Sequence, residues 1–163
     1  MSNSDSSRTK AYIGLGANLG DPIQQIIDAR EALYRLSSSR NGRCSSLYLS
    51  SPVGYSQQPN FVNCVLELES TLDPHSLFVC MRDIENSLGR VRHETNQNAA
   101  RLIDLDLLLF GEQAIDDEVL SVPHPRIGER LFVLKPLAEL GPKIAQSSSV
   151  NFTTQILHKL VCR

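Results

Sequence analysis

The chain lacks the features that would place it in a membrane or on a nucleic acid. No apolar run approaches the roughly 18 residues that a membrane-spanning helix needs. Its 16 lysine and arginine residues are outnumbered by 18 aspartate and glutamate residues, which gives a formal net charge of −2. Nucleic-acid-binding proteins usually carry an excess of basic residues. The sequence therefore predicts neither a membrane protein nor a nucleic-acid-binding protein.

Cysteine and tryptophan are scarce as well. The chain has no tryptophan, and none of its four cysteines forms a C-x-x-C pair of the kind that binds metals or cycles between redox states. Cys64 and Cys80 lie in apolar periodic segments, so we expect buried thiols and a reducing compartment. The first nine residues are polar and rich in serine, without the apolar core of a signal peptide. We therefore expect residues 1–9 to be a disordered tail on a cytoplasmic protein.

The remaining residues, 10–163, predict a single domain. They contain no internal repeat or low-complexity linker, and a hydrophobic content of 41% suits one well-packed core. Asp21-Pro22 and Asp73-Pro74 are typical helix starts, with the aspartate as N-cap and the proline in the first turn. The predicted elements are strands over 10–16, 44–49, 61–69, 101–110 and 119–122, helices over 22–36, 74–88, 129–140 and 153–161, and loops over 37–42, 50–60 and 111–118.

The order of these elements predicts the fold class. A β-α-β-β-α-β succession with extra C-terminal elements indicates an α+β protein of the ferredoxin-like type. We expect an α/β sandwich in which the sheet is rich in antiparallel strands and the helices pack on the sheet.

The strand that ends at Phe110 carries the clearest chemical signal, because its leucine-rich sequence contains Asp104 and Asp106. Burying two carboxylates without partners would be costly, so a divalent cation or the basic residues around Arg101 should face them. The alternative is an exposed edge strand with solvated carboxylates, which the surrounding leucines disfavour. Oxygen-only ligation suits Mg²⁺ that is shared with substrate phosphates. Because side chains alternate along a strand, the predicted faces are Leu102, Asp104, Asp106, Leu108 and Phe110 on one side and Ile103, Leu105, Leu107 and Leu109 on the other.

A basic stretch before this strand is the second signal. It contains Arg90, Arg92 and His93, and Arg101 follows it. A solvated basic loop would explain any one of these residues, but guanidinium groups next to two aspartates also suit the binding of phosphate groups. The sequence has no G-x-x-x-x-G-K-[ST] motif, which excludes a P-loop enzyme. Spacing alone thus predicts a Mg²⁺-dependent site for a phosphorylated ligand.

Four blocks of sequence together resemble the 6-hydroxymethyl-7,8-dihydropterin pyrophosphokinase family, whose members move pyrophosphate from ATP to a pterin alcohol. In order and spacing the blocks cover residues 11 to 140 or so, which makes the match far more specific than a D-x-D pair alone. The blocks are Ala11 to Asp21; Ser51 to Gly54 with Gln58 to Asn63; Ile84 to Arg92 with Arg101 to Asp106; and Val122 to His124 with Arg130 to Phe132.

The resemblance implies roles for residues in these blocks. Asp104 and Asp106 would hold two Mg²⁺ ions against the ATP phosphates. The flat pterin ring would lie between Phe61 and Phe132, and its edge would bond Asn63 and main-chain groups around Ser50 to Val53. The residues expected to contact ATP are Glu85, Arg92, Leu107, His124 and Arg130, and those expected to act in catalysis are Arg90, Arg92 and Asp106.

The resemblance also implies the reaction and the partners. The hydroxymethyl oxygen would attack the β-phosphorus of ATP in line and AMP would leave, with Asp106 as the nearest candidate base. We expect a monomer whose partners are ATP and the pterin. Two rivals stay open, namely another Mg²⁺-dependent phosphotransferase or phosphohydrolase, and a nucleotide-binding protein without turnover. The loop before Arg101 departs from the family pattern, because it reads Asn96-Gln-Asn-Ala-Ala100 and has no tryptophan.

Overall fold

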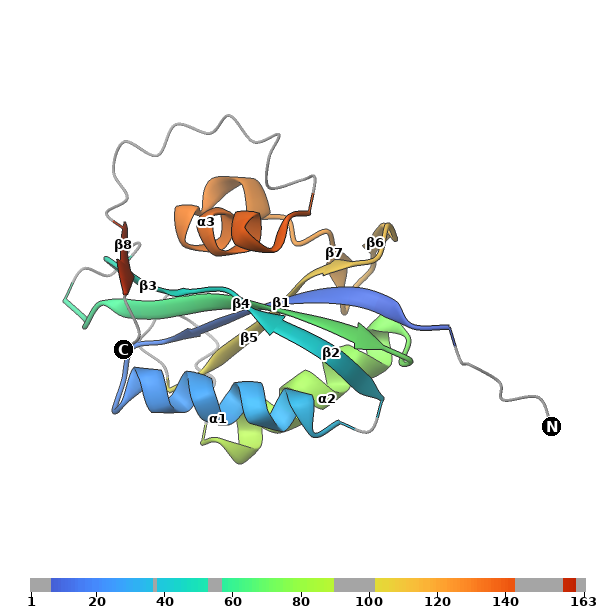
Figure 1. Cartoon of the computed structure of the whole chain (residues 1–163), viewed down its shortest axis with the longest axis horizontal. Coiled ribbons are helices and arrows are strands. Elements are labelled where there is room, and N and C mark those ends of the chain that lie inside the picture. Colours follow the sequence, from blue (N-terminus) through green and yellow to red (C-terminus); the bar gives the residue numbers. More distant parts are fainter. Residues whose placement is uncertain (1–6, 37, 53–56, 90–101, 143–156, 161–163) are drawn as a thin grey trace.

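The computed structural model describes residues 7–36, 38–52, 57–89, 102–142 and, for the main chain alone, 157–160. A six-stranded sheet has helices α1 and α2 on one face and helix α3 on the other (Figure 1). The elements are β1 (Thr9–Ala17), α1 (Pro22–Tyr34), β2 (Ser39–Cys44), β3 (Leu47–Ser50), β4 (Phe61–Ser70), α2 (Pro74–Ser87), β5 (Asp104–Phe110), β6 (Ile115–Asp116), β7 (Ser121–Val122), the 3₁₀ helix η1 (Ile127–Glu129), α3 (Leu131–Leu140) and β8 (Leu157–Leu160).

The topology confirms the predicted ferredoxin-like α+β class. The strand order is β5-β1-β4-β3-β8, β2 also pairs with β4, and every pairing in the sheet is antiparallel. Both predicted helix caps are present: Asp21 accepts from the Gln24 amide at 3.1 Å, and Asp73 accepts from the Ser76 amide at 3.0 Å. These caps satisfy amides that the first helical turn leaves without intrahelical partners.

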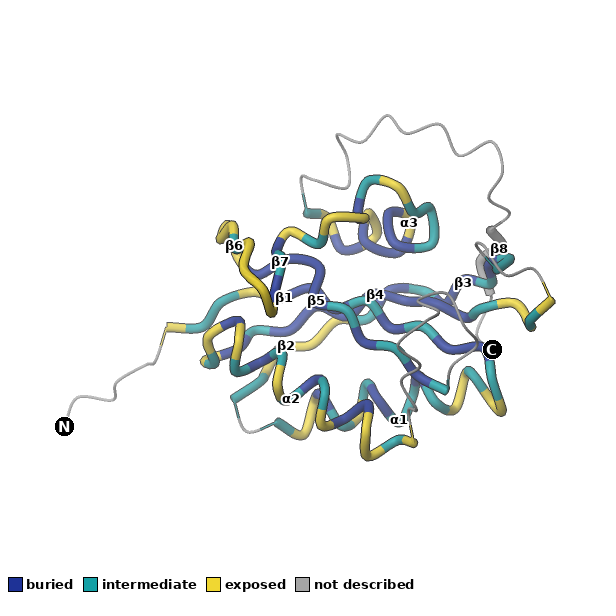
Figure 2. Tube along the Cα trace, turned by 180° about the vertical axis from the view of Figure 1, so that it is seen from behind, coloured by how far each residue is buried: buried dark blue, intermediate teal, exposed yellow. Residues whose placement is uncertain are grey.

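Two apolar clusters lie on the two faces of the sheet, and much of the central strands and of the sheet-facing sides of the helices is buried (Figure 2). The larger cluster joins α1 and α2 to the sheet through residues such as Leu33, Leu66 and Leu77. The smaller one joins α3 to the sheet through Leu137 and Val65, among others. Of the two thiols that we expected to be buried, Cys64 is buried but Cys80 is only half-buried.

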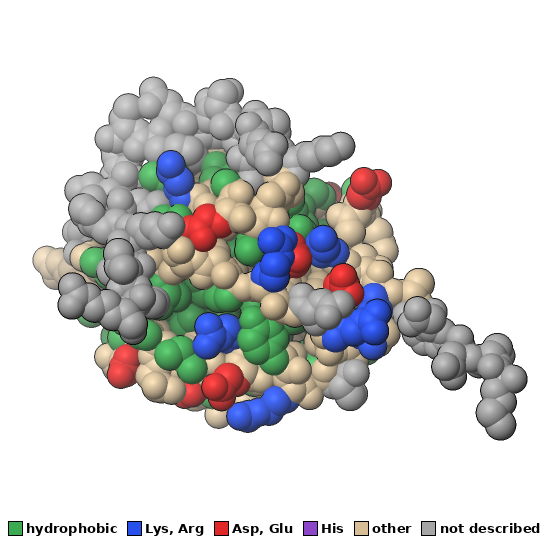
Figure 3. Space-filling model, viewed as in Figure 1, with side chains coloured by type: hydrophobic (Ala, Val, Ile, Leu, Met, Phe, Trp, Pro, Cys, Tyr) green, Lys and Arg blue, Asp and Glu red, His purple; other side chains and the backbone are tan. Residues whose placement is uncertain are grey.

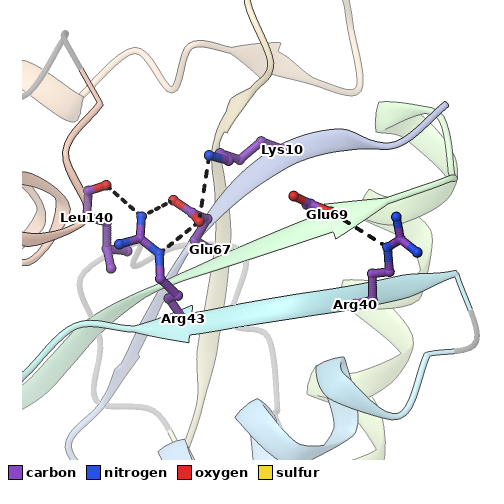
Figure 4. Close-up of polar contacts among 6 residues, drawn as sticks. All are labelled: Lys10, Arg40, Arg43, Glu67, Glu69 and Leu140. Atoms are coloured by element: carbon purple, nitrogen blue, oxygen red, sulfur yellow. Dashed lines mark hydrogen bonds and ion pairs between the residues drawn. The ribbon is translucent and has the colours of Figure 1, made fainter.

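Helix α3 is fixed to the sheet by polar contacts at its C-terminal end. Glu139 accepts hydrogen bonds from the Tyr48 hydroxyl and, at 2.9 Å, from the Ser46 amide. Arg43 of β2 donates to the Leu140 carbonyl at 2.9 Å, so it binds one of the carbonyls that the helix end leaves open (Figure 4). These contacts fix the C-terminal end of α3 against β2 and β3.

Strand β5 departs from the predicted alternation. Tyr12 pairs with Leu109 but Ile13 pairs with Leu107, so β5 has a bulge at Leu108. One extra residue in a strand reverses the facing of the residues that follow. The prediction is therefore wrong for two residues: Phe110 lies in the α1 and α2 cluster, and Leu109 joins Leu108 in the α3 cluster.

Several other boundaries differ from the predictions. The expected loop 37–42 contains the start of β2, and the expected single strand 44–49 is divided between β2 and β3. The segment 111–118 contains β6, which pairs with β7 in a small separate hairpin. The predicted helix over 153–161 is wrong, because 157–160 form strand β8 beside β3. None of the described helices is long and apolar enough to cross a membrane.

Candidate functional site

Several of the predicted site residues lie on the α3 face of the sheet, near the C-terminal end of β1. Gly16 of β1 pairs with Asn63 of β4 on one side and with Asp104 of β5 on the other. Residues paired across strands point to the same face, so the Asn63 amide and the Asp104 carboxylate flank a position without a side chain. Asp106 lies two residues along β5, before the bulge, and therefore shares that face. One row of the sheet thus joins the expected pterin-binding and metal-binding residues.

The two aspartates are half-buried rather than buried, which corrects the premise behind their assignment. Strand β5 lies at the edge of the sheet, although its leucines are almost wholly buried. The desolvation cost of Asp104 and Asp106 is therefore smaller than the sequence suggested. Half-exposed carboxylates on an edge strand are accessible to a cation that brings its own waters and phosphates. Among the described residues, no group of three or more His, Cys, Asp or Glu side chains is placed to hold a metal ion.

Asn63 is held in a fixed orientation. Its side chain is 6% exposed, and its Nδ2 donates to Ser50 Oγ at 2.8 Å. The other end of the amide, Oδ1, points over Gly16, because a Cβ built there would lie 2.9 Å from it. Phe61 precedes Asn63 by two residues, so it lies on the same face, and it pairs with Ser50 of β3. Ser50, Phe61 and Asn63 are therefore brought together, as predicted.

Arg130 and Phe132 lie at the N-terminal end of α3, and both are half-buried. The Arg130 guanidinium carbon is 5.5 Å from the centre of the Phe132 ring, within cation–π range. His124 is tied to the aspartate strand, because its amide donates to the Leu108 carbonyl at 2.9 Å. This contact places the loop before α3 beside β5.

Burial and two nearby arginines keep His124 neutral at pH 7. Burial lowers the pKa of His124 below 6.5, and the charges of Arg130 and Arg126 lower it further, while Asp104 acts in the opposite direction. Its Nδ1 accepts from the Arg126 amide at 3.2 Å. A neutral imidazole that accepts at Nδ1 carries its hydrogen on Nε2. His124 can therefore donate one hydrogen bond from Nε2 without carrying a charge.

Glu85 and Leu107 lie on the opposite face from these residues. Glu85 is 1% exposed, and its Oε1 accepts from the Leu105 amide at 2.9 Å, so it covers part of the outer edge of β5. The Leu107 side chain is 2% exposed and belongs to the core beneath the sheet. Any ligand contact with Leu107 would therefore use its main chain.

Comparison with known proteins decides the family. Residues 12–142 match the family model described as 7,8-dihydro-6-hydroxymethylpterin-pyrophosphokinase, or HPPK. This chain belongs to the HPPK family.

Relatives in three organisms agree with this assignment. The chain is 40% identical over 145 residues to the 2-amino-4-hydroxy-6-hydroxymethyldihydropteridine pyrophosphokinase of Bacillus subtilis, covering 89% of this chain and 86% of that one. It is 44% identical over 135 residues to the protein of the same name in Pseudomonas aeruginosa, covering 83% and 82%. The folic acid synthesis protein FOL1 of Dictyostelium discoideum is 36% identical over 156 residues, which are 96% of this chain but 22% of FOL1.

Solved structures of HPPK-DHPS from Plasmodium falciparum share the fold. The wild-type chain with pteroate has a TM-score of 0.57 and 14% sequence identity, covering 78% of this chain and 38% of that chain. The A437G/K540E chain with pterin and p-hydroxybenzoate has a TM-score of 0.58 and covers 78% of this chain. The chain spans about two fifths of these larger proteins. At this identity the likeness supports the HPPK fold alone.

Some of the predicted HPPK site residues lie outside the described part of the chain. These residues are Val53, Arg90 and Arg92; His93 and Arg101 of the basic stretch and the atypical loop residues Asn96 to Ala100 also lie outside it. Their assignments stay predictions.

Near the site, the structure adds a buried polar residue that the sequence did not single out. Asn18 is 3% exposed, and its Nδ2 donates to Gln58 Oε1 at 2.9 Å and to the Pro59 carbonyl at 3.0 Å. It joins the end of β1 to the residues that lead into Phe61. The local pattern Gly16-Ala-Asn18 resembles an ordinary turn, so only the long-range contact reveals this function.

Proposed function

We propose that the chain transfers pyrophosphate from ATP to the hydroxymethyl group of 6-hydroxymethyl-7,8-dihydropterin and releases AMP, a step of folate biosynthesis. The family match and the names of the relatives support this ATP-dependent transferase activity. The observation that carries the proposal is the row of β-sheet residues Asp104, Gly16 and Asn63. It sets an acidic group and a fixed amide on one face, on either side of a glycine.

The pterin would bind on the Asn63 side of this row. Because Nδ2 of Asn63 donates to Ser50, Oδ1 remains oriented to accept from an N–H group on the pterin edge. Phe61 and Phe132 would cover the two faces of the ring. Stacking of a nucleic-acid base on an aromatic side chain contributes about 1–3 kcal/mol, a fair analogy for this ring. Main-chain groups around Ser50 to Val53 would complete the contacts.

The triphosphate would lie between the aspartates and the start of α3. Arg130 would donate to phosphate oxygens, and the neutral Nε2–H of His124 would add a hydrogen bond. We assign Arg92 to the same phosphates and Arg90 to closure over the reacting groups, from the sequence alone. Glu85 would act near the nucleotide by fixing the edge of β5, and Leu107 would offer its main chain there.

The residues present fit Mg²⁺. The donors are the oxygens of Asp104 and Asp106, and Mg²⁺ is usually held by one or two carboxylates together with waters and substrate phosphates. When bound, two such ions would neutralise charge on the phosphates during the transfer. Asp106 remains the nearest candidate to accept the proton of the pterin hydroxyl.

The reaction itself requires positioning more than covalent chemistry. The hydroxymethyl oxygen forms a bond to the β-phosphorus, the bond from that phosphorus to the α,β-bridging oxygen breaks, and AMP leaves with the electron pair. A site that holds two substrates in line can supply much of the rate by orientation. Because all assigned residues belong to one chain, we also propose that the protein acts as a monomer, in the cytoplasm where ATP is available.

A product assay tests the proposal. The protein is mixed with Mg²⁺, ATP and the pterin alcohol, and the nucleotide products are separated. We expect AMP that forms only when the pterin is present. Asp106→Asn should reduce AMP formation by a hundredfold or more and change pterin affinity, measured by pterin fluorescence, by less than threefold. Asp83→Asn, an exposed change on α2, is the control. ADP, inorganic phosphate or no product with the wild type would contradict the proposal.

A further inference from the structure

We propose that Gly16 is a positioning residue for the pterin: its missing side chain fixes where the Asn63 amide sits and keeps open the space between that amide and Asp104. The inference rests on the proposed function and extends it to a residue that contributes no functional group of its own. In this view Gly16 determines whether a flat heterocycle held at Asn63 can reach the acidic side of the site.

The first argument is the place of Gly16 in the sheet. It lies in β1, between Asn63 of β4 and Asp104 of β5, and all three residues face α3. Neighbouring strands are 4.7–4.9 Å apart, so the α-carbons of Asn63 and Asp104 are about 10 Å apart. A side chain at position 16 would rise between them. Without one, the Asn63 amide reaches over position 16 toward the Asp104 side of the row.

The second argument is steric. A Cβ at position 16 would lie 2.9 Å from Asn63 Oδ1, closer than real Cβ atoms approach an oxygen. Asn63 cannot easily move away, because it is 6% exposed and its Nδ2 is bonded to Ser50 Oγ. Gly16 is not among the glycines with a positive φ, so its backbone does not require glycine. The requirement comes from the neighbouring amide.

Gly14 provides a matched comparison on the same strand and the same face. It pairs with Val65 and Asp106, two residues away from Gly16. A Cβ there would meet the Leu108 side chain at 3.5 Å, an ordinary van der Waals contact. An alanine should therefore fit at position 14 and not at position 16. The comparison separates the effect of any added methyl group on β1 from the effect of one beside Asn63.

The experiment measures pterin binding in the absence of ATP. For Gly16→Ala we expect the Kd for the pterin, from its fluorescence, to rise at least tenfold, and for Gly14→Ala to change by less than threefold. The Kd for a non-hydrolysable ATP analogue with Mg²⁺ should stay within threefold in both variants. Equal pterin Kd values for Gly16→Ala and wild type would overturn the inference.

A double-mutant cycle tests whether Gly16 acts through Asn63. In the Asn63→Ala background, Gly16→Ala should weaken pterin binding by less than threefold, because the amide it displaces is no longer there. A further tenfold loss in that background would show that Gly16 acts by another route and would contradict the inference.

Side-chain NMR gives a readout that needs no ligand. The Asn63 side-chain NH₂ resonances should shift in Gly16→Ala, as the hydrogen bond to Ser50 is lost, and stay in place in Gly14→Ala. Unshifted resonances in Gly16→Ala would overturn the steric argument. If the wild type binds no pterin, the proposed function fails, and these resonances still decide whether Gly16 positions the amide.

Discussion

Glu67 is a buried carboxylate in the middle of β4, and its partners come from neighbouring strands. Arg43 donates from two nitrogens, at 3.0 Å to Oε1 and 2.8 Å to Oε2, and Lys10 is 3.9 Å away (Figure 4). Burial alone would raise the pKa of Glu67, but hydrogen bonds from Arg43 and Tyr12 and the nearby positive charges outweigh it and lower that pKa. The carboxylate therefore stabilises the fold while it is ionised.

This arrangement predicts a stability effect that depends on pH. Glu67→Gln should lower the free energy of unfolding at pH 7 by about 1.5 kcal/mol, the low end for hydrogen bonds to a charged group, since Arg43 is half exposed and can turn to water. A lowered carboxyl pKa contributes stability above the unfolded value of 4.5, and this contribution is lost as the pH falls below that value toward the folded pKa. Urea unfolding at several pH values measures the difference.

Glu69→Gln is the control for this prediction. Glu69 lies two residues along β4 and faces Arg40 at 3.8 Å in a more exposed pair (Figure 4). Exposed pairs contribute little, so its loss should cost less than about 0.5 kcal/mol. Acidic and basic side chains stand next to one another on the face shown in Figure 3, and the two glutamates differ mainly in exposure, which is 5% for the Glu67 side chain and 32% for that of Glu69. If the two variants lost equal free energy of unfolding, the prediction that Glu67 contributes more than Glu69 would be wrong.

For single residues, the sequence identified candidates by their chemical type and missed residues whose importance comes from long-range contacts. Asp104 and Asp106 stand out because carboxylates interrupt a leucine-rich strand. Asn63 and Phe61 gained meaning only from the family pattern. Gly16 has no chemical signal, because its importance comes from an amide 47 positions later in the chain, which no local pattern contains. The close contact between Gly16 and Asn63 follows from the register in which β1 pairs with β4.

Helix α3 carries two of the proposed site residues, Arg130 and Phe132, and packs on the sheet that carries the others. It has only ten residues and contains Pro136, so packing and its end contacts, rather than its own propensity, hold it in place. Leu137 lies at the centre of its buried face and is 0% exposed. Arg130 and Phe132 lie at the other end. The geometry of the proposed site thus depends on how firmly α3 is packed.

We therefore predict that Leu137→Ala releases α3 before the rest of the fold. The lost packing and the cavity should cost about 2–5 kcal/mol. Hydrogen exchange should show that α3 amides lose protection while β4 amides keep most of theirs, because regions of low local stability open first. Pterin affinity should fall with the loosening of Phe132.

The matched control is Lys135→Ala, an exposed change in the same helix, which should alter the unfolding free energy by less than about 0.5 kcal/mol. If Leu137→Ala reduced protection equally in α1, α2 and α3, the helix would not be a separate unit and the prediction would be wrong.

The elements that the sequence predicted well have both an apolar period and an end signal. Helices α1 and α2 combine an aspartate cap, a proline and a buried stripe, and every second residue of β4 from Val62 to Leu68 lies in the α1 and α2 cluster. Strand β2 was missed because Asn41-Gly42 is a typical turn sequence, whereas its pairing with β4 depends on Arg40 and Arg43 facing glutamates. The local pattern of 153–161 predicts a helix, whereas 157–160 form β8 because they pair with the edge of β3. That contact is far away in sequence, so no local pattern contains it.

At the scale of the whole molecule, the order of elements sufficed for the fold class, since few arrangements bury both faces of such a sheet. The position of the aspartate strand was not predictable in the same way. Its leucines disfavoured an exposed edge strand, yet β5 is an edge strand whose outer side is partly covered by Glu85 and by the His124 segment. The leucines are buried by helices, while the aspartates reach the surface.

This placement predicts that the metal serves the reaction and not the fold. Structural metal sites are closed by ligands from the protein, and their loss unfolds small domains. Here both apolar clusters form without Asp104 or Asp106, which are half-buried on an edge strand. Removing divalent ions with EDTA should therefore abolish AMP formation, leave the unfolding temperature within about 1 °C, and be reversed by added Mg²⁺. The Asp106→Asn variant should keep the same unfolding temperature with and without EDTA. A fall of several degrees in the wild type alone would mean that a bound ion stabilises the sheet, and the assignment of these carboxylates to a site shared with substrate phosphates would have to be abandoned.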